Sequence, residues 1–256
     1  VPGPEAELIL CCARTQLTAP LTERIRTLLD LTLDWPNLVR TALIQRVAPL
    51  VYNRLSTIRP EVVPAAVLDD LERRYLANAE RDLLLAEELP RIVAAFESRG
   101  VRAIPFKGPL IAAALYGNLS LRRFYDLDIL VHPHDARRAS EAVLSLGYRQ
   151  EGFAGDWESH FMEEQGRWPV DLHERVAPRF FPSPAPFDEL WARQQPVPVQ
   201  GRPILTLAPV HLLLVLVLGL QARVVGAVHV VHQDVVGDPR VLEDLHVLRA
   251  VQHQFR

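Results

Sequence analysis

The sequence predicts an α+β fold, in which a small mixed β-sheet core lies between a helical N-terminal region and C-terminal helices. Apolar residues recur at helical spacing from about residue 4 to residue 99. Short strand-like and helix-like segments then alternate between residues 101 and 175, which is typical of a mixed sheet with helices packed on it. Helical spacing returns near Pro209.

The N-terminal region, residues 1–100, is expected to be a helical bundle. Segments such as LTERIRTLLDLTL and NLVRTALIQRV place apolar residues on one helical face. Thr18 and Asp34 are expected to cap helices, because their short side chains can accept a bond from a free backbone N–H. Gly100 is expected to end the last helix of the region.

The predicted core occupies residues 101–175. Its first strand is expected at a sheet edge, because Pro105 has no N–H to donate to a neighbouring strand. Gly147 is expected to stop the core's second helix. In chain order, we expect a strand over 101–106, a helix over 110–116, a strand over 126–131, a helix over 135–146 and a strand at 170–172.

Residues 176–218 predict a proline-rich loop, a hairpin that turns at Gln200-Gly201, and a helix. The remaining segment, residues 219–256, has an atypical composition and is considered separately below. These limits divide the chain into four parts.

The composition excludes several classes of protein. The chain has 256 residues, 49% hydrophobic and 23% charged, with a formal net charge of -3, so general nucleic-acid binding is not expected. The longest apolar run, residues 210–220, is too short to span a membrane, and no secretory signal opens the chain. We therefore expect a cytoplasmic protein. Cys11 and Cys12 are adjacent, which suits two apolar thiols better than a disulfide or a metal site.

Two aspartates interrupt the apolar strand YDLDILV. Successive strand side chains point to opposite faces, so Asp126 and Asp128 share one face while Leu127 and Ile129 share the other. The two carboxylates are then about 7 Å apart along the strand, from a rise of about 3.3 Å per residue. They repel each other unless a cation lies between them. Oxygen ligands of this kind predict Mg²⁺ or Mn²⁺ as cofactor.

The neighbouring sequence favours a phosphate ligand at the same place. Lys107 and Gly108 come directly before a predicted helix, where free N–H groups and the positive end of the helix dipole attract phosphate. Arg122 can bind further phosphate oxygens. Asp171 lies in another short strand and can bring a third carboxylate. His173, two residues later, is the histidine expected to face the site as a candidate pocket residue.

The order of these parts resembles an uncharacterised bacterial nucleotidyltransferase family of the DNA polymerase beta-like superfamily. The resemblance covers roughly residues 30 to 215. It implies that the core is a nucleotidyltransferase core, with Gly108 in the phosphate-binding turn, a metal-binding pair and a third carboxylate. One departure is Pro109, where many relatives have a serine that contacts phosphate. The resemblance is carried by Lys107-Gly108, Leu115-Tyr116-Gly117, Arg122, Asp126-Leu127-Asp128, Gly147-Tyr148 and Val170-Asp171-Leu172-His173.

The activity that the resemblance implies is transfer of a nucleoside monophosphate from an NTP to an acceptor, with release of pyrophosphate. Asp126, Asp128 and Asp171 would be catalytic and hold the metal, while Lys107, Gly108 and Arg122 would bind phosphates. The acceptor stays open among a small molecule, a peptide or protein, and an RNA end; no membrane partner is expected.

Two alternatives to this activity stay open at the level of sequence. One keeps the fold as a catalytically degraded module that binds a nucleotide or a partner. The other takes Asp126-Leu-Asp128 as the metal motif of a nucleotide-sugar glycosyltransferase. The absence of an N-terminal nucleotide-binding α/β half argues against the glycosyltransferase.

The tail from residue 219 departs from the pattern that the resemblance implies. Relatives continue with a His-rich and Trp-rich helical pattern, whereas this chain has no tryptophan after Trp191. A back-translation of Leu220 to Val235 read out of phase can yield a Trp-containing string. We therefore expect that a frameshift produced this tail and that the tail packs poorly. An uninterrupted reading frame in independent isolates, or a protease-resistant tail, would contradict this.

Overall fold

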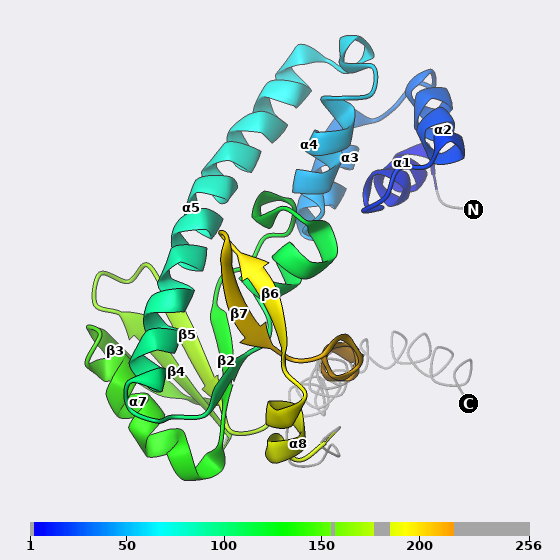
Figure 1. The fold of residues 1–256 in the computed structure, drawn as a ribbon. Coiled ribbons are helices and arrows are strands. Elements are labelled where there is room, and N and C mark those ends of the chain that lie inside the picture. Colours follow the sequence, from blue (N-terminus) through cyan, green and yellow to red (C-terminus); the bar gives the residue numbers. More distant parts are fainter. Residues whose placement is uncertain (1–2, 155–156, 177–184, 218–256) are drawn as a thin grey trace, which may run out of the picture. The chain divides into compact units, whose positions relative to one another are not determined.

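The computed structural model describes residues 3–154, 157–176 and 185–217 (Figure 1). Most of these residues belong to one compact unit, Val1–Arg175 with Ala185–Ala208. The second unit comprises Val176–Pro184 and Pro209–Arg256. Of the second unit, residues 209–217 are helical, as predicted, and the tail considered above lies outside the described residues. No helix among the described residues is both long and apolar enough to cross a membrane.

The N-terminal region is helical, as predicted. Thr18 Oγ1 accepts a hydrogen bond from the N–H of Leu21, and Asp34 Oδ1 accepts one from Asn37, so both predicted caps are confirmed. Cys12 is buried and Cys11 is half-buried, and neither forms a disulfide. The elements are α1 (Pro4–Cys12), α2 (Ala19–Leu29), α3 (Trp35–Ile44), α4 (Ala48–Leu55), the 3₁₀ turn η1 (Pro60–Val62) and α5 (Ala65–Glu97).

Helix α5 belongs to two hydrophobic cores. Leu71, near its start, packs with α1 to α4, whereas Leu85, Leu89 and Phe96 pack against the sheet. Figure 1 shows this long helix running from the helical region to the strands. The end of α5 near residue 100 is therefore not a boundary between independently packed parts, because its second half completes the core of the sheet.

The sheet has five strands in the order β1-β2-β5-β4-β3. Strands β2 and β5 are parallel, and the other neighbouring pairs are antiparallel, so the sheet is mixed, as predicted. β1 lies at one edge, as Pro105 predicts, and Thr206 Oγ1 donates to the Pro105 carbonyl at 2.7 Å. The strands are β1 (Ala103–Pro105), β2 (Leu127–Val131), β3 (Tyr148–Ala154), β4 (Glu158–Glu163) and β5 (Pro169–His173).

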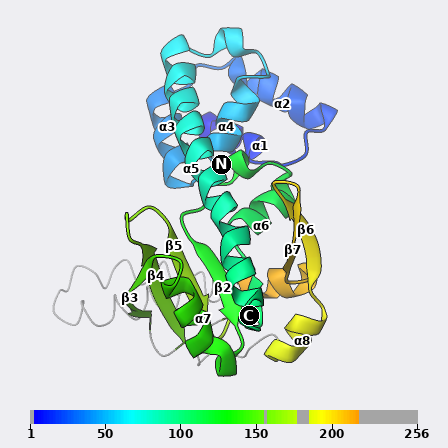
Figure 2. The same cartoon turned by 60° about the vertical axis from the view of Figure 1, so that its left-hand side comes forward.

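One face of this sheet is apolar and forms the core. Helices α5 and α7 (Ala136–Leu144) contribute to this core, and both views show them beside the strands (Figure 2). Because side chains alternate along a strand, the opposite face of β2, β4 and β5 receives the remaining residues. The buried strand residues of the apolar face are Leu127, Ile129, Val131, Phe161, Val170 and Leu172.

The segments that connect the strands agree in part with the prediction. Gln200 and Gly201 both have positive φ, +49° and +76°, which is the geometry of a two-residue hairpin turn, so the predicted hairpin is confirmed. The predicted helix over 110–116 is one short α-helical turn followed by a π-helix. The remaining elements are α6 (Pro109–Ile111), the π-helix η2 (Ala112–Tyr116), the 3₁₀ turns η3 (Leu119–Leu121) and η4 (Pro133–Asp135), α8 (Phe187–Ala192), β6 (Gln195–Val199) and β7 (Arg202–Thr206).

The strands β3 and β4 were not predicted from the sequence. Both carry several charged residues, and β3 is an edge strand with a register shift between Gln150 and Gly152. Their alternation of apolar and polar residues is correspondingly weak. These strands complete the sheet and, as shown below, β4 contributes two side chains to its polar face.

A buried carboxyl group in α5 gives a prediction about stability. Asp82 is fully buried, and within the described part of the chain neither of its carboxylate oxygens has a hydrogen-bond partner, although Arg81 Nη1 lies 3.6 Å from Oδ1. Burial raises the pKa of Asp82 to about 7, although the charges of Arg81 and Arg123 oppose the shift. Since the folded protein then binds a proton that the unfolded chain releases, stability should fall as pH rises from about 4 to about 7.

Asp82→Asn should remove this pH dependence and be more stable than the unchanged protein at about pH 8. Urea unfolding across this pH range measures the effect. Asp70→Asn, on the same helix, is the control. Asp70 pairs with Arg74 at 2.8 Å, which lowers the pKa of Asp70, so this substitution should instead reduce stability at neutral pH. Parallel pH profiles for Asp82→Asn and the unchanged protein would contradict the assignment.

Candidate functional site

The polar face of the sheet carries six ionisable side chains, five on three adjacent strands and one, Asp126, directly before β2. Asp128 on β2 lies opposite Asp171 on β5, and Asp171 lies opposite His160 on β4. Two residues further along β5, His173 lies opposite Glu158 on β4. Residues in register on neighbouring strands point to the same face, so these side chains converge. We call this set the acidic face: Asp126, Asp128, Glu158, His160, Asp171 and His173.

Asp128 is the most tightly held member of the acidic face. It is 7% exposed, and its Oδ1 accepts hydrogen bonds from Lys107 Nζ at 2.6 Å and from His173 Nε2 at 2.9 Å. Burial by itself would raise the pKa of Asp128. The bond from His173 and the charge of Lys107 outweigh burial and hold the pKa at about 2, so this carboxylate is ionised at neutral pH.

Asp126 directly precedes β2, and its pKa is shifted in the opposite direction from that of Asp128. Burial, together with the negative charges of Asp128 and Asp171, raises the pKa of Asp126 to about 6. The group is half-buried, and among the described residues no cationic side chain pairs with it as Lys107 pairs with Asp128. Three carboxylates therefore converge with more negative charge than Lys107 neutralises. Their oxygen donors and this unbalanced charge fit a hard divalent cation such as Mg²⁺.

Asp171 has a histidine partner, His160, on the neighbouring strand β4. His160 Nδ1 is 2.8 Å from Asp171 Oδ1 and 3.9 Å from Glu158 Oε1. Burial would lower the pKa of His160, but the bond to Asp171 and the nearby carboxylates raise it. Burial also raises the pKa of Glu158. No local signal in the sequence marks Glu158.

The structure places the remaining predicted residues around the same face. His173 is buried between the rings of Phe106 and Trp157, with centroid distances of 5.3 and 5.6 Å, rather than open to a pocket. Arg122 is half-buried, and its Nη1 donates to the Gly108 carbonyl at 3.5 Å. Burial lowers the pKa of Arg122.

The turn at Lys107-Gly108 differs from the expected row of free N–H groups. Pro109 has no N–H, and the N–H of Leu110 donates to the Lys107 carbonyl at 3.2 Å. The α-helical part that follows has only three residues. Phosphate binding at this turn would therefore rest on the lysine side chain and on close backbone approach at Gly108, rather than on a helix dipole.

Gly108 cannot be replaced without strain. Its φ of +56° and ψ of -124° lie in a region that L-residues rarely adopt, and an added Cβ would lie 3.0 Å from the Asp126 carbonyl oxygen. We expect Gly108→Ala to cost on the order of 1–3 kcal/mol of stability and to displace Asp126, lowering activity. Thermal unfolding and turnover measure the two effects.

The matched control for this change is Gly117→Ala. Gly117 also has a positive φ, +65°, but no atom lies within 4 Å of an added Cβ. The Gly117→Ala variant should lose some stability and retain activity. Equal loss of activity in both variants would contradict the close approach of Gly108 to Asp126.

Helix α5 fixes the backbone that leads into Asp126. Arg81 donates from Nη1 to the Phe124 carbonyl at 2.7 Å and from Nη2 to the Tyr125 carbonyl at 3.0 Å. The guanidinium groups of Arg81 and Arg123 also lie over the ring of Tyr125, 5.1 and 4.4 Å from its centroid. These contacts orient the two residues that precede the first carboxylate.

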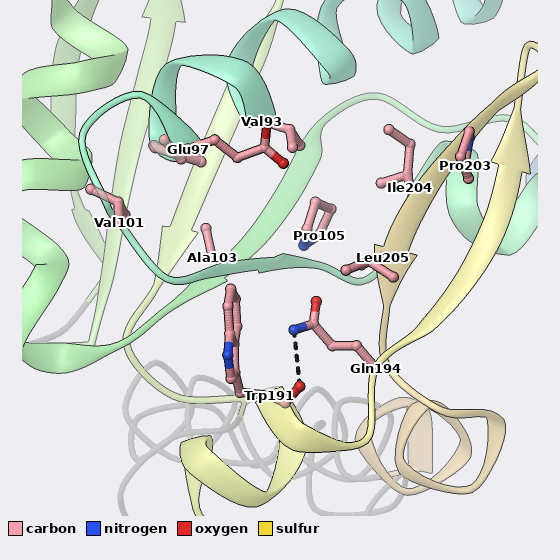
Figure 3. A pocket seen from close by; sticks show the side chains of 11 residues that line it. Val93, Glu97, Val101, Ala103, Pro105, Trp191, Gln194, Pro203, Ile204 and Leu205 are labelled. Atoms are coloured by element: carbon pink, nitrogen blue, oxygen red, sulfur yellow. Dashed lines mark hydrogen bonds between the residues drawn. The ribbon is translucent and has the colours of Figure 1, made fainter.

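A separate small pocket, about 100 Å³ in volume, lies between the end of α5, β1, α8 and β7 (Figure 3). Its lining is mainly apolar and includes Val93, Phe96 and Ile204. Gln194 Nε2 donates to the carbonyl of Trp191 at its rim. No residue of the acidic face lines this pocket, and Glu97 is the only ionisable residue among the described residues that line it, so we assign the pocket no role in the chemistry.

Comparison with protein families decides the class of this site. The sequence profile of the uncharacterised nucleotidyltransferase family matches residues 31–229, which include the whole acidic face. The chain belongs to this family. The chain is therefore an enzyme, and the predicted family and fold class are confirmed. The match also extends beyond residue 219, where the atypical tail was predicted to begin.

Solved structures of antibiotic-modifying enzymes show limited similarity to this nucleotidyltransferase. Lincosamide antibiotic adenylyltransferase LnuA, bound to lincomycin, is 16% identical, with a TM-score of 0.39 over 50% of this chain and 83% of its own. The antibiotic-resistance factor ANT(2'')-Ia in solution is 19% identical, with a TM-score of 0.40 over 51% of this chain and 69% of its own. The same factor in complex with adenylyl-2''-tobramycin is 20% identical, with a TM-score of 0.37 over 48% of this chain and 68% of its own. Curated protein sequences give no match.

Proposed function

We propose that this nucleotidyltransferase uses a divalent metal to transfer a nucleoside monophosphate from an NTP to an acceptor, with release of pyrophosphate. The observation that carries the proposal is the convergence of Asp126, Asp128 and Asp171 beside the ammonium group of Lys107. The family assignment decides against the glycosyltransferase alternative. We place the reaction in the cytoplasm, as the composition predicts.

Each residue has a role in this proposal. Asp126 and Asp128 would hold Mg²⁺ or Mn²⁺, which offsets the negative charge that develops on the phosphate oxygens. Lys107, Gly108 and Arg122 would bind the phosphates. Asp171 would accept the proton of the acceptor hydroxyl as its oxygen attacks the α-phosphorus, and the bond from this phosphorus to the β-phosphate oxygen would break. Pyrophosphate would leave with that bond's electron pair.

His173 would act as a positioning residue in the same reaction. It contacts Asp128 through Nε2 and is packed between two aromatic rings, so it fixes the orientation of this carboxylate. A fixed orientation matters because a ligand displaced by about 1 Å can cost roughly 10²-fold in rate. His173 is too buried to line an open acceptor pocket.

The test is a labelling experiment. The full chain is incubated with each α-labelled NTP, Mg²⁺ and fractions of a cell extract, and the fraction that becomes labelled identifies the acceptor. Appearance of labelled acceptor together with pyrophosphate supports the proposal. Binding of an NTP without any metal-dependent turnover in all fractions would favour the nucleotide-binding module instead, and nucleoside diphosphate as product would contradict the reaction.

A further inference from the structure

We propose that Arg46, Arg81 and Arg123 bind a phosphate group of the acceptor, so that the acceptor is a small phosphorylated compound. We call these three residues, together with Tyr125, the arginine cluster. The inference rests on the proposed function for its place in the transfer reaction. Binding of phosphate to the cluster needs no turnover, so the two proposals can be tested separately.

Three guanidinium groups of the arginine cluster lie over one aromatic ring. The Cζ atoms of Arg46, Arg81 and Arg123 are 5.3, 5.1 and 4.4 Å from the centroid of the Tyr125 ring. The arginines come from three separate segments: the turn between α3 and α4, helix α5, and the loop before β2. Each cation is attracted to the ring, but three like charges at this spacing repel one another. An anion bound among them would remove this repulsion.

The arginine cluster has more positive charge than its surroundings neutralise. Among the described residues, no carboxylate pairs with Arg46 or Arg123, and the Nε of Arg123 is buried without a hydrogen-bond partner. Asp82 lies 3.6 Å from Arg81, but burial raises the pKa of Asp82 to about 7, so it is only partly ionised at neutral pH. Arg46 is exposed, which leaves the cluster accessible to a ligand from solvent.

The backbone at Arg46 gives an independent reason to expect a role for its side chain. Its φ is +58°, and it follows the last turn of α3 as the left-handed residue of a Schellman motif. In this motif the N–H of Arg46 donates to the Leu43 carbonyl and the N–H of Val47 donates to the Ala42 carbonyl. Glycine is favoured at such a position, because any side chain there is strained. The chain instead has an arginine, whose guanidinium reaches the cluster.

The position of the cluster favours the acceptor over the NTP as the source of the phosphate. The phosphates of the NTP are proposed to bind at Lys107, Gly108 and Arg122. Among the described residues, none of the cluster's three arginines pairs with a carboxylate of the acidic face. The two sites are nevertheless neighbours, because the charges of Asp126 and Asp82 both raise the pKa of Arg122, against the effect of burial.

The size of the arginine cluster favours a single phosphate group. Guanidinium groups donate in pairs to phosphate oxygens, so three of them can satisfy one phosphate. A nucleic-acid chain instead requires cations that follow its backbone over several phosphates. The chain as a whole has a formal net charge of -3, which gives no general attraction for such a polymer.

The experiment follows the arginine side chains of the full chain. The Nε–H resonances of the ¹⁵N-labelled protein are recorded while inorganic phosphate is added in the presence of a chelator, with sodium chloride at matched ionic strength as reference. We expect the Arg81 and Arg123 signals to shift in a saturable way with phosphate and not with chloride. Arg46→Gly should weaken phosphate binding by at least about tenfold, because it removes a charged donor. Its stability to urea should stay equal or rise, because glycine suits the left-handed backbone.

Arg59→Gly is the matched control for Arg46→Gly. Arg59 also has a positive φ, +51°, but it pairs with Asp30 at 2.5 Å and lies outside the arginine cluster. The Arg59→Gly variant should keep the phosphate affinity of the unchanged protein. Absence of a phosphate-specific shift, or equal phosphate affinity in Arg46→Gly and the unchanged protein, would overturn the site.

Two further titrations distinguish the sources of the phosphate. With Mg²⁺ and a saturating α,β-methylene analogue of an NTP, the cluster should still bind inorganic phosphate or glycerol phosphate. Loss of this binding would assign the cluster to the NTP, and displacement of glycerol phosphate by far lower concentrations of single-stranded RNA would assign it to RNA. Either result would contradict a small phosphorylated acceptor. Failure of NTP turnover in the labelling experiment would count against the proposed function and leave the titration with phosphate alone unaffected.

Discussion

Asp128→Asn is expected to reduce nucleotidyl transfer by at least about 10³-fold, because it removes a charge on which the proposed metal and the reacting phosphate both depend. The carboxylate also accepts bonds from Lys107 and His173, and the neutral amide would leave both donors with a weaker partner. We therefore expect the free energy of unfolding to fall by about 1–3 kcal/mol at neutral pH.

Asp126→Asn is the matched comparison, and its effect on stability should have the opposite sign. It should also abolish transfer, but it removes a carboxylate whose pKa is raised to about 6 by burial and by its acidic neighbours. Ionised Asp126 destabilises the fold above that pH, so the amide should leave stability unchanged or increase it.

Incorporation of label into the acceptor measures transfer, and urea unfolding in the presence of a chelator measures stability. The stabilising effect of Asp128 should be present above its unfolded pKa and be lost as pH falls toward about 2. Full activity in either variant would refute the metal assignment. Equal changes in stability would refute the different environments of the two carboxylates.

Asp171→Asn is expected to slow the chemical step by about 10²–10⁴-fold while the dissociation constant for NTP changes little. The reason is that Asp171 lies one strand away from the Asp126–Asp128 pair and contacts His160 at 2.8 Å. Its proposed role is removal of the acceptor proton, which does not contribute to nucleotide binding. Single-turnover rates and equilibrium binding of NTP separate the two quantities.

Glu163→Gln provides the control for Asp171→Asn. Glu163 is also an acidic residue of the sheet, but it pairs with Arg167 at 3.2 Å and is not part of the acidic face. The Glu163→Gln variant should retain both the rate of the chemical step and the affinity for NTP. If Asp171→Asn instead lost NTP affinity with an unchanged chemical step, Asp171 would be a nucleotide-binding residue.

Much of the fold could be predicted because local sequence determines it. The alternation of carboxylates and aliphatic residues in β2 predicts both the strand and the direction of its side chains, and the structure has this strand from Leu127 to Val131. The caps at Thr18 and Asp34 and the turn at Gln200-Gly201 likewise depend on only a few adjacent residues. Such features require no knowledge of distant contacts.

The parts that could not be predicted depend on pairing between distant residues. His160 contacts Asp171 because β4 pairs with β5 in one particular register, and no local pattern specifies this register. Glu158 reaches the acidic face for the same reason. Asp82 has an ordinary place in a helical sequence, and only the packing of α5 against the segment before Asp126 buries it.

The contact between Lys107 and Asp128 has a consequence for the order of ligand binding. A cation that takes Asp128 Oδ1 competes with the ammonium group that lies 2.6 Å from this oxygen. Displacement of the ammonium frees its positive charge beside Gly108, where the phosphates are proposed to bind. Metal and nucleotide should then bind cooperatively, and thermodynamic linkage requires each to increase the affinity of the other by the same factor.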